Sequence, residues 1–198
     1  ARLRVALELL ATDPREDLQQ QIQRDITELD ELVGELLLAS RMEVGNGAER
    51  YEELDLLALT AEEAAQSGLE VGGETVDMRG DKQALTVLVR NLISNAKRHG
   101  GNIIEVNVRA IDAQSARLTV SDSGPGIPEA QRKEIFEPFY RVEGSHRPDD
   151  DSGEKGIGLG LYLVRQIARF HGGEAICRES VTGGCCFEIT LRRIAAES

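Results

Sequence analysis

A stripe of aliphatic residues over residues 17–42 is the feature that most constrains this chain, because its spacing suits only a long helix. The stripe is formed by Ile22, Ile26, Leu29, Val33 and Leu36. These residues follow one another at steps of 4, 3, 4 and 3, which is typical of a coiled-coil seam. Leu32, Leu37 and Leu38 widen the stripe, which favours a four-helix bundle over a two-stranded coil.

A shorter helix is predicted ahead of this one, from the helical spacing of Leu3, Ala6, Leu7 and Leu10. Asp13-Pro14 ends that pattern, because Pro cannot donate within a helix. At about 1.5 Å per residue the two helices span roughly 16 and roughly 40 Å, so much of the long stripe lacks a partner. A second subunit is one explanation. We favour a first helix cut short at its N-terminus, and we expect a piece of a longer polypeptide, since residue 1 is Ala.

The rest of the chain predicts a second domain of mixed structure. Residues 45–58 read as a linker, since Gly45-Asn46-Gly47 breaks the helix and the acidic stretch from Glu49 to Asp55 is expected to be solvated. Helices are predicted at 57–67, 81–98 and 159–171, and strands at 104–110, 117–121, 174–179 and 185–192. Asp81 is the expected N-cap of the second helix, and Gly183-Gly184 is the expected turn between the last two strands. Helices on one face of a mixed sheet make an α+β sandwich. The expected domains are therefore residues 1–44 and 59–198.

Composition excludes several classes of protein. A net charge of −12 argues against nonspecific nucleic-acid binding, which needs basic clusters. Three cysteines without a CxxC pair exclude a disulfide framework and fit a reducing compartment. The sequence contains no run of about 18 apolar residues, so no membrane span is predicted. Cys185 and Cys186 point to opposite faces of their strand, so core packing of one is favoured over a metal or redox role.

Four clusters in the second domain carry candidate chemistry, and the first lies on the predicted helix 81–98. Asn91, Asn95 and Arg98 share one face of that helix. The neighbouring stripe is apolar and is expected to be buried; it is formed by Leu85, Leu88, Leu92 and Ala96. Amide oxygens suit Mg²⁺ and Arg suits phosphate oxygens. His99 lies closer to the apolar side, where it could pack on a base. The alternative is an ordinary amphipathic helix with polar border residues.

Two clusters are rich in glycine. Asp122-Ser123-Gly124-Pro125-Gly126-Ile127 follows a strand and combines a strong acceptor with glycines that allow close approach, or else forms a surface turn. The segment 156–161, Gly-Ile-Gly-Leu-Gly-Leu, opens a helix whose N–H groups can bind an anion, or else is a flexible loop. It is neither a Walker A loop nor the GxGxxG fingerprint.

The fourth cluster, residues 136–141, reads Phe-Glu-Pro-Phe-Tyr-Arg and precedes a charged stretch, 142–155, with few apolar residues. A loop of this length is often a lid over a site, and the three aromatic residues at its base are expected to anchor its hinge. The alternative is a disordered insertion.

Taken together in this order, the four clusters resemble the N, G1, F and G2 boxes of the bacterial two-component sensor histidine kinases, members of the GHKL ATPase superfamily. The resemblance covers essentially the whole chain. Residues 1–44 look like the dimerisation and histidine-phosphotransfer hairpin, and about 50–194 like the catalytic ATP-binding domain.

The resemblance implies roles for individual residues. Asn95 would ligate Mg²⁺ and Asn91 would lie beside the triphosphate of ATP. Arg98 would meet a phosphate, and His99 would flank the nucleotide, where the family more often has Tyr or Phe. Asp122 would accept the adenine amine and so select ATP over GTP.

The remaining implied residues shape the pocket or act on the transferred group. The pocket and lid residues are Gly124, Gly126, Ile127, Tyr140, Gly156, Gly158, Leu159 and Gly160. Arg141 would neutralise charge on the γ-phosphoryl group, and Lys155 is a further candidate for that role.

One departure from the family is large. Its phospho-acceptor is a His on the first helix, but the histidines here are His99, His146 and His171. The acceptor is therefore expected to be missing just upstream. His171 is expected to act structurally, as a cation at a helix C-terminus.

The resemblance also implies partners and a location. The partners would be a second copy of the chain, bound through the hairpin, and a response-regulator receiver domain. This portion would be cytoplasmic and would reach the inner membrane only through upstream segments. Two alternatives stay open: a GHKL ATPase or protein-serine kinase, and a dimerisation module with an inactive nucleotide pocket.

Overall fold

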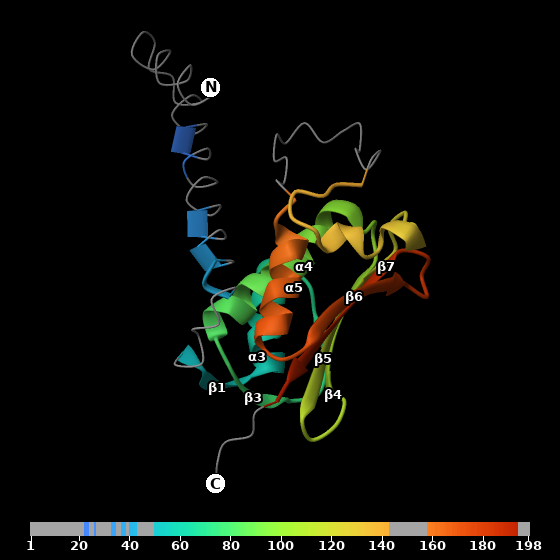
Figure 1. Ribbon diagram of the computed structural model, residues 1–198. Coiled ribbons are helices and arrows are strands. Elements are labelled where there is room, and N and C mark those ends of the chain that lie inside the picture. The colour runs from blue at the N-terminus through green and yellow to red at the C-terminus, as the bar shows by residue number, and fades with distance from the viewer. Residues whose placement is uncertain are drawn as a thin grey trace. The chain divides into compact units, whose positions relative to one another are not determined.

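The computed structural model describes residues 50–142 and 158–193 and, before them, only the helical residues Ile22, Gln23, Ile26, Val33, Gly34, Leu37, Leu38 and 40–42 (Figure 1). The chain divides into two compact units, Ala1–Ser40 and Arg41–Ser198. In the first unit Ile22 and Leu38 are buried, whereas Ile26, Val33 and Leu37 are exposed. The predicted helix before residue 14, the rest of the helix over 17–42, and most of the predicted lid lie outside the described residues.

A five-stranded sheet is the centre of the second unit. Its order is β2-β4-β5-β7-β6, and only the β2–β4 pair is parallel. The strands are β2 (Val71–Gly73), β4 (Ile104–Ala110), β5 (Ser115–Asp122), β7 (Cys185–Arg192) and β6 (Glu174–Glu179). Side chains alternate between the two faces of a strand, and Ala116, Leu118 and Val120 of β5 are fully buried on one face.

Three helices pack on one face of this sheet, which confirms the α+β class (Figure 1). They are α3 (Leu56–Gln66), α4 (Lys82–His99) and α5 (Gly160–Phe170). The Asp81 side chain accepts from the Ala84 N–H at 3.0 Å, so the predicted N-cap of α4 is confirmed. The apolar stripe of α4 is buried against the sheet and α5, through Leu85, Leu88, Leu92 and Ala96.

A second, two-stranded sheet joins β1 (Glu52–Asp55) to β3 (Asp77–Gly80) in antiparallel pairing. The linker prediction for residues 45–58 is therefore wrong over this strand. Asp55 was expected to be solvated, but its Oδ1 accepts from the Leu57 N–H at 2.9 Å and the Val76 N–H at 3.2 Å. This acidic residue caps α3 and fastens it to the chain before β3.

Two 3₁₀ turns, η2 (Glu129–Gln131) and η3 (Glu134–Phe136), connect β5 to the segment before α5. Phe136 is buried and packs edge-to-face on Phe187 of β7, with ring centroids 6.4 Å apart. The predicted aromatic anchor of the fourth cluster is thus fixed to the sheet by Phe136, whereas Phe139 is 63% exposed.

His171 joins the C-terminal end of α5 to the N-terminal end of α4. Its Nε2 accepts from the Asp81 N–H at 3.1 Å, so Nδ1 carries the proton and donates to the Ile167 carbonyl at 2.8 Å. The Tyr51 ring stacks on it. Burial lowers the pKa of His171, against the opposing effects of the Ile167 hydrogen bond and the Asp81 charge. The prediction of a structural role holds, but the predicted cation at the helix terminus is wrong: this geometry requires the neutral ring.

We expect acid to destabilise the domain through His171. The unfolded chain takes up this proton near pH 6.5, whereas the folded state takes it up only at lower pH. The contribution is therefore complete above about pH 7 and is lost progressively as pH falls below 6.5 and through the lower pKa of the folded state. Melting temperatures of wild type and His171→Gln, measured from pH 7.5 to 5.5, should fall more steeply for wild type. An unchanged slope, with His99→Gln as the exposed control, would contradict this role.

Candidate functional site

Asp122 ends β5 with a side chain that is only 4% exposed. Its Oδ1 accepts from the Gly124 N–H at 2.9 Å and from the Cys185 N–H at 3.1 Å. Its backbone carbonyl accepts from the Thr182 hydroxyl at 2.9 Å. Within residues 50–142 and 158–193, no group donates to Oδ2. One oxygen thus holds the carboxylate in place, and the other is left for a donor on a ligand.

Glycines surround this carboxylate because there is no room for side chains. A Cβ on Gly184 would overlap the Asp122 carbonyl and Oδ1 and lie 2.6 Å from the Gly124 nitrogen. A Cβ on Gly124 would overlap the His99 carbonyl, and one on Gly100 would overlap the Ala96 carbonyl and the Asp122 side chain. The end of β5 is therefore clamped between the end of α4 and the β6–β7 turn.

The predicted polar face of α4 lies beside its buried stripe. Asn91, Asn95 and Arg98 are partly exposed and His99 is exposed. The Asn91 amide nitrogen donates to the Val87 carbonyl at 3.0 Å. In the described part of the chain, Asn95 makes no side-chain hydrogen bond, so its amide oxygen can take a ligand.

The start of α5 packs directly on this face of α4. A Cβ on Gly160 would overlap Oδ1 of Asn91, so glycine allows the two helices to approach. Gly158, at φ +84°, accepts through its carbonyl from the Phe139 N–H at 3.0 Å. Leu159 between them is buried. The structure therefore brings the first, third and fourth clusters together.

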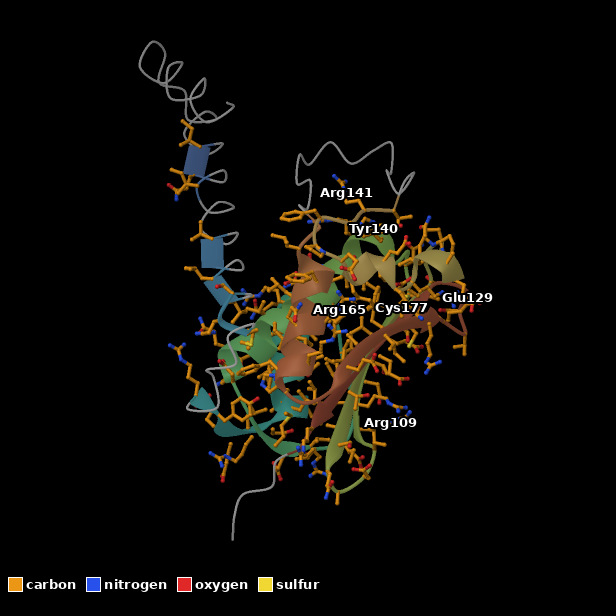
Figure 2. The ribbon with its side chains drawn as sticks, viewed as in Figure 1. Arg109, Glu129, Tyr140, Arg141, Arg165 and Cys177 are labelled. Atoms are coloured by element: carbon orange, nitrogen blue, oxygen red, sulfur yellow. The ribbon has the colours of Figure 1, made fainter. Side chains whose placement is uncertain are left out.

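The remaining described residues of the predicted site are Tyr140, Arg141, Gly126 and Ile127. Figure 2 shows Tyr140 and Arg141 at the end of the domain where α5 begins, and Arg141 is exposed. Gly126, at φ +74°, lies against the β6–β7 turn, where a Cβ would be 3.4 Å from the Gly183 carbonyl. The Ile127 carbonyl accepts from Arg132 at 2.9 Å, which holds it towards η2.

Lys155 and Gly156 lie outside the described residues, as does His146.

Sequence reasoning missed the contribution of the β6–β7 turn. Gly183-Gly184 was expected only as a hairpin turn, yet Thr182, Gly184 and Cys185 all contact Asp122. The glycine pair was a visible signal. The position of this turn against Asp122 depends on the pairing of β7 with β5, and these two strands are far apart in the sequence.

Comparison with known proteins identifies the class. Residues 80–194 match the family described as histidine kinase-, DNA gyrase B- and HSP90-like ATPases, and the chain belongs to this family. The match includes every site residue named above, so the resemblance inferred from the four clusters is confirmed at the level of the family.

Individual relatives narrow the class to sensor kinases. The chain is 33% identical over 168 residues to the signal transduction histidine-protein kinase AfsQ2 of Streptomyces coelicolor, covering 82% of this chain and 30% of AfsQ2. It is 34% identical over 176 residues to the histidine-protein kinase/phosphatase MprB of Mycobacterium sp. strain KMS, covering 84% and 33%. The chain thus spans about a third of the length of these curated relatives.

A solved ATP-binding domain has a similar fold. The ATP-binding domain of PrrB from Mycobacterium tuberculosis superposes with a TM-score of 0.59 at 26% identity, covering 74% of this chain and 99% of that domain.

Proposed function

We propose that this chain is the ATP-binding catalytic core of a two-component protein-histidine kinase. The observation that carries the proposal is Asp122, a buried carboxylate with one oxygen fixed by two backbone N–H groups and the other open to a ligand. It lies where α4, the β6–β7 turn and the glycine segment of the second cluster meet.

Oδ2 of Asp122 is suited to accept the exocyclic amine of adenine. Guanine presents a carbonyl oxygen at the equivalent position, and two acceptors repel one another. Because Oδ1 is already saturated, the carboxylate cannot turn to relieve that repulsion. Adenine is therefore favoured over guanine.

The polar face of α4 and the start of α5 would hold the triphosphate. Arg98 can contact a phosphate, Asn91 borders it, and the N–H groups at the start of α5 favour an anion. Asn95 would hold Mg²⁺ through its amide oxygen, because this side chain makes no hydrogen bond in the described part of the chain. Bound Mg²⁺ would screen the phosphate charges.

Charge on the transferred γ-phosphoryl group would be met by Arg141, with Lys155 as a second candidate. Arg141 is exposed and lies two residues after Phe139, whose N–H donates to the Gly158 carbonyl just before α5, so its position in the chain is next to the proposed triphosphate site.

The proposed acceptor is a His that this sequence does not contain, since none of its three histidines lies in residues 1–44. From that His the phosphoryl group would pass to an Asp on a response-regulator receiver domain. Residues 1–44 would form the dimerisation and phosphotransfer hairpin, with residues 59–198 as the catalytic domain.

The exposed apolar residues Ile26, Val33 and Leu37 support a homodimer through that hairpin.

None of the described helices is long and apolar enough to cross a bilayer. We place this portion in the cytoplasm, attached to the inner membrane through segments outside this sequence.

Calorimetric titration with the non-hydrolysable analogue AMPPNP, with and without Mg²⁺, tests the proposal. We expect saturable binding that Mg²⁺ strengthens. No binding by the folded chain would instead favour a module with an inactive pocket. Steady phosphate release from ATP, without transfer to a His-bearing hairpin supplied in trans, would favour an ATP-hydrolysing relative.

Asn95→Ala is expected to remove most of the Mg²⁺ effect. It should weaken AMPPNP binding about tenfold with Mg²⁺ present and leave it nearly unchanged without Mg²⁺, since a contact to a charged group is lost. Asn107→Ala, an exposed Asn on the same domain, is the matched control. An equal loss with and without Mg²⁺ would remove Asn95 from the metal site.

A further inference from the structure

Two cysteines meet on one face of the sheet beside the nucleotide site. The β6–β7 register pairs Cys177 with Phe187 and Glu179 with Cys185, so Cys177 and Cys185 are diagonal neighbours on the same face. Phe187 is fully buried, which makes this the helix-covered face. Cys185 is buried with it, whereas Cys177 is only half-buried because β6 is the outermost strand (Figure 2). Cys186 points to the opposite face.

The two thiols are chemically unequal. The neighbouring Cys185 thiol and the nearby Arg132 guanidinium lower the pKa of Cys177 against the effect of burial. Arg132 is held by the Ile127 carbonyl at 2.9 Å and by Glu179 at 3.7 Å. Proximity to Cys177 and burial raise the pKa of Cys185. Cys177 is the more exposed of the two thiols and is thus the accessible nucleophile, and Cys185 is the thiol that can react with it after oxidation.

Cys185 also belongs to the setting of Asp122. Its backbone N–H is one of the two donors that fix Oδ1 of that carboxylate. It follows Gly184, which has no room to move towards Asp122. A displacement of Cys185 therefore changes the orientation of the carboxylate that would read the adenine ring.

We propose that Cys177 and Cys185 form an oxidation site for hydroperoxides, in which disulfide formation weakens nucleotide binding. The Cys177 thiolate attacks one peroxide oxygen, the O–O bond breaks, and an alcohol or water leaves as Cys177 becomes a sulfenic acid. The Cys185 sulfur then attacks that sulfur, the S–O bond breaks, and hydroxide leaves with the thiol proton as water. In sum, two thiols and one hydroperoxide give a disulfide, an alcohol and water, or two waters from hydrogen peroxide.

The disulfide requires the strands to move. Diagonal neighbours lie about 7–8 Å apart in a sheet, whereas a disulfide needs Cα atoms about 4.4–6.8 Å apart. Closing the bond therefore draws Cys185 towards β6 and its N–H away from Asp122. This consequence, though not the bond itself, rests on the proposed nucleotide site.

Peroxide treatment of the purified chain tests both parts. After reaction with hydrogen peroxide and removal of the excess by catalase, free thiols are alkylated and tryptic peptides are mapped. Cleavage after Arg178 separates Cys177 (residues 170–178) from Cys185 and Cys186 (residues 179–192). We expect these two peptides to be cross-linked, and AMPPNP binding to weaken about tenfold, as for loss of a hydrogen bond to a charged group. Dithiothreitol should reverse both.

Variants assign the bond. Cys186→Ser should still form it, and Cys177→Ala should not. Cys177→Ala should bind AMPPNP normally and no longer respond to peroxide. Three results would each overturn the proposal. Cys177 could be oxidised without forming a cross-link, or the cross-link could require Cys186. Alternatively, the cross-linked chain could bind AMPPNP as tightly as the reduced chain does. Failure of the reduced wild type to bind AMPPNP would count against the nucleotide site instead.

Discussion

Replacing Asp122 by Asn is expected to weaken AMPPNP binding about a hundredfold, which corresponds to about 2.8 kcal/mol. The Asn oxygen can still accept from the Gly124 and Cys185 N–H groups, so the fold should survive. That orientation places the amide –NH₂ where Oδ2 was, facing the adenine amine. Two donors then oppose each other in a confined site, so the loss exceeds that of a single neutral hydrogen bond.

The matched control is Asp112→Asn. Asp112 also accepts locally, from the Gln114 N–H at 2.7 Å, but it lies in the exposed β4–β5 turn. This variant should bind as wild type does. If Asp122→Asn melts normally and binds within about threefold of wild type, adenine recognition does not depend on this carboxylate.

Gly184→Ala is expected to damage stability and binding together. The new methyl group meets the Asp122 carbonyl and Oδ1 and the Gly124 backbone, none of which is the free end of a flexible side chain. Overpacking of this kind costs about 2 kcal/mol, or about 4–8 °C in melting temperature for a chain of this size. AMPPNP binding should fall about tenfold or more, because Asp122 must move.

Gly183→Ala separates the steric effect from backbone strain. Gly183 has φ +93°, so alanine is strained there, but a Cβ would meet nothing within 4 Å. We expect about 1 kcal/mol of destabilisation and unchanged binding. If both variants bind like wild type, the turn does not position Asp122.

The sequence predicted those parts of the fold that have strong local signals. The Asp81 cap, the buried stripe of α4 and the alternating strands β4 and β7 each follow a single rule of spacing or capping. The strands β1, β2 and β3 were missed because they are only 4, 3 and 4 residues long. Such short segments are too short to show a clear alternation of apolar and polar residues. The hydrogen bond from Val76 to Asp55 cannot be foreseen from sequence, so an acidic residue there is expected to be solvated.

The site was predictable only within each motif. Helical spacing places Asn91 and Asn95 on one face whatever the tertiary structure, so that part is confirmed. The contacts of Gly184 with Asp122, and of Cys177 with Cys185, depend on which strands are neighbours and in what register. Core packing of either Cys185 or Cys186 was predicted, and Cys185 is the buried one, but the neighbouring thiol of Cys177 comes from another strand.

Base selectivity tests the central claim most directly, because it depends on the one open oxygen of Asp122. The measurement is calorimetric titration of the wild-type chain with Mg-AMPPNP and, in parallel, with the guanine analogue Mg-GMPPNP. We expect saturable binding of the adenine nucleotide and binding at least about a hundredfold weaker for the guanine nucleotide. Equal affinity for the two nucleotides, or binding of neither by the folded chain, would contradict it.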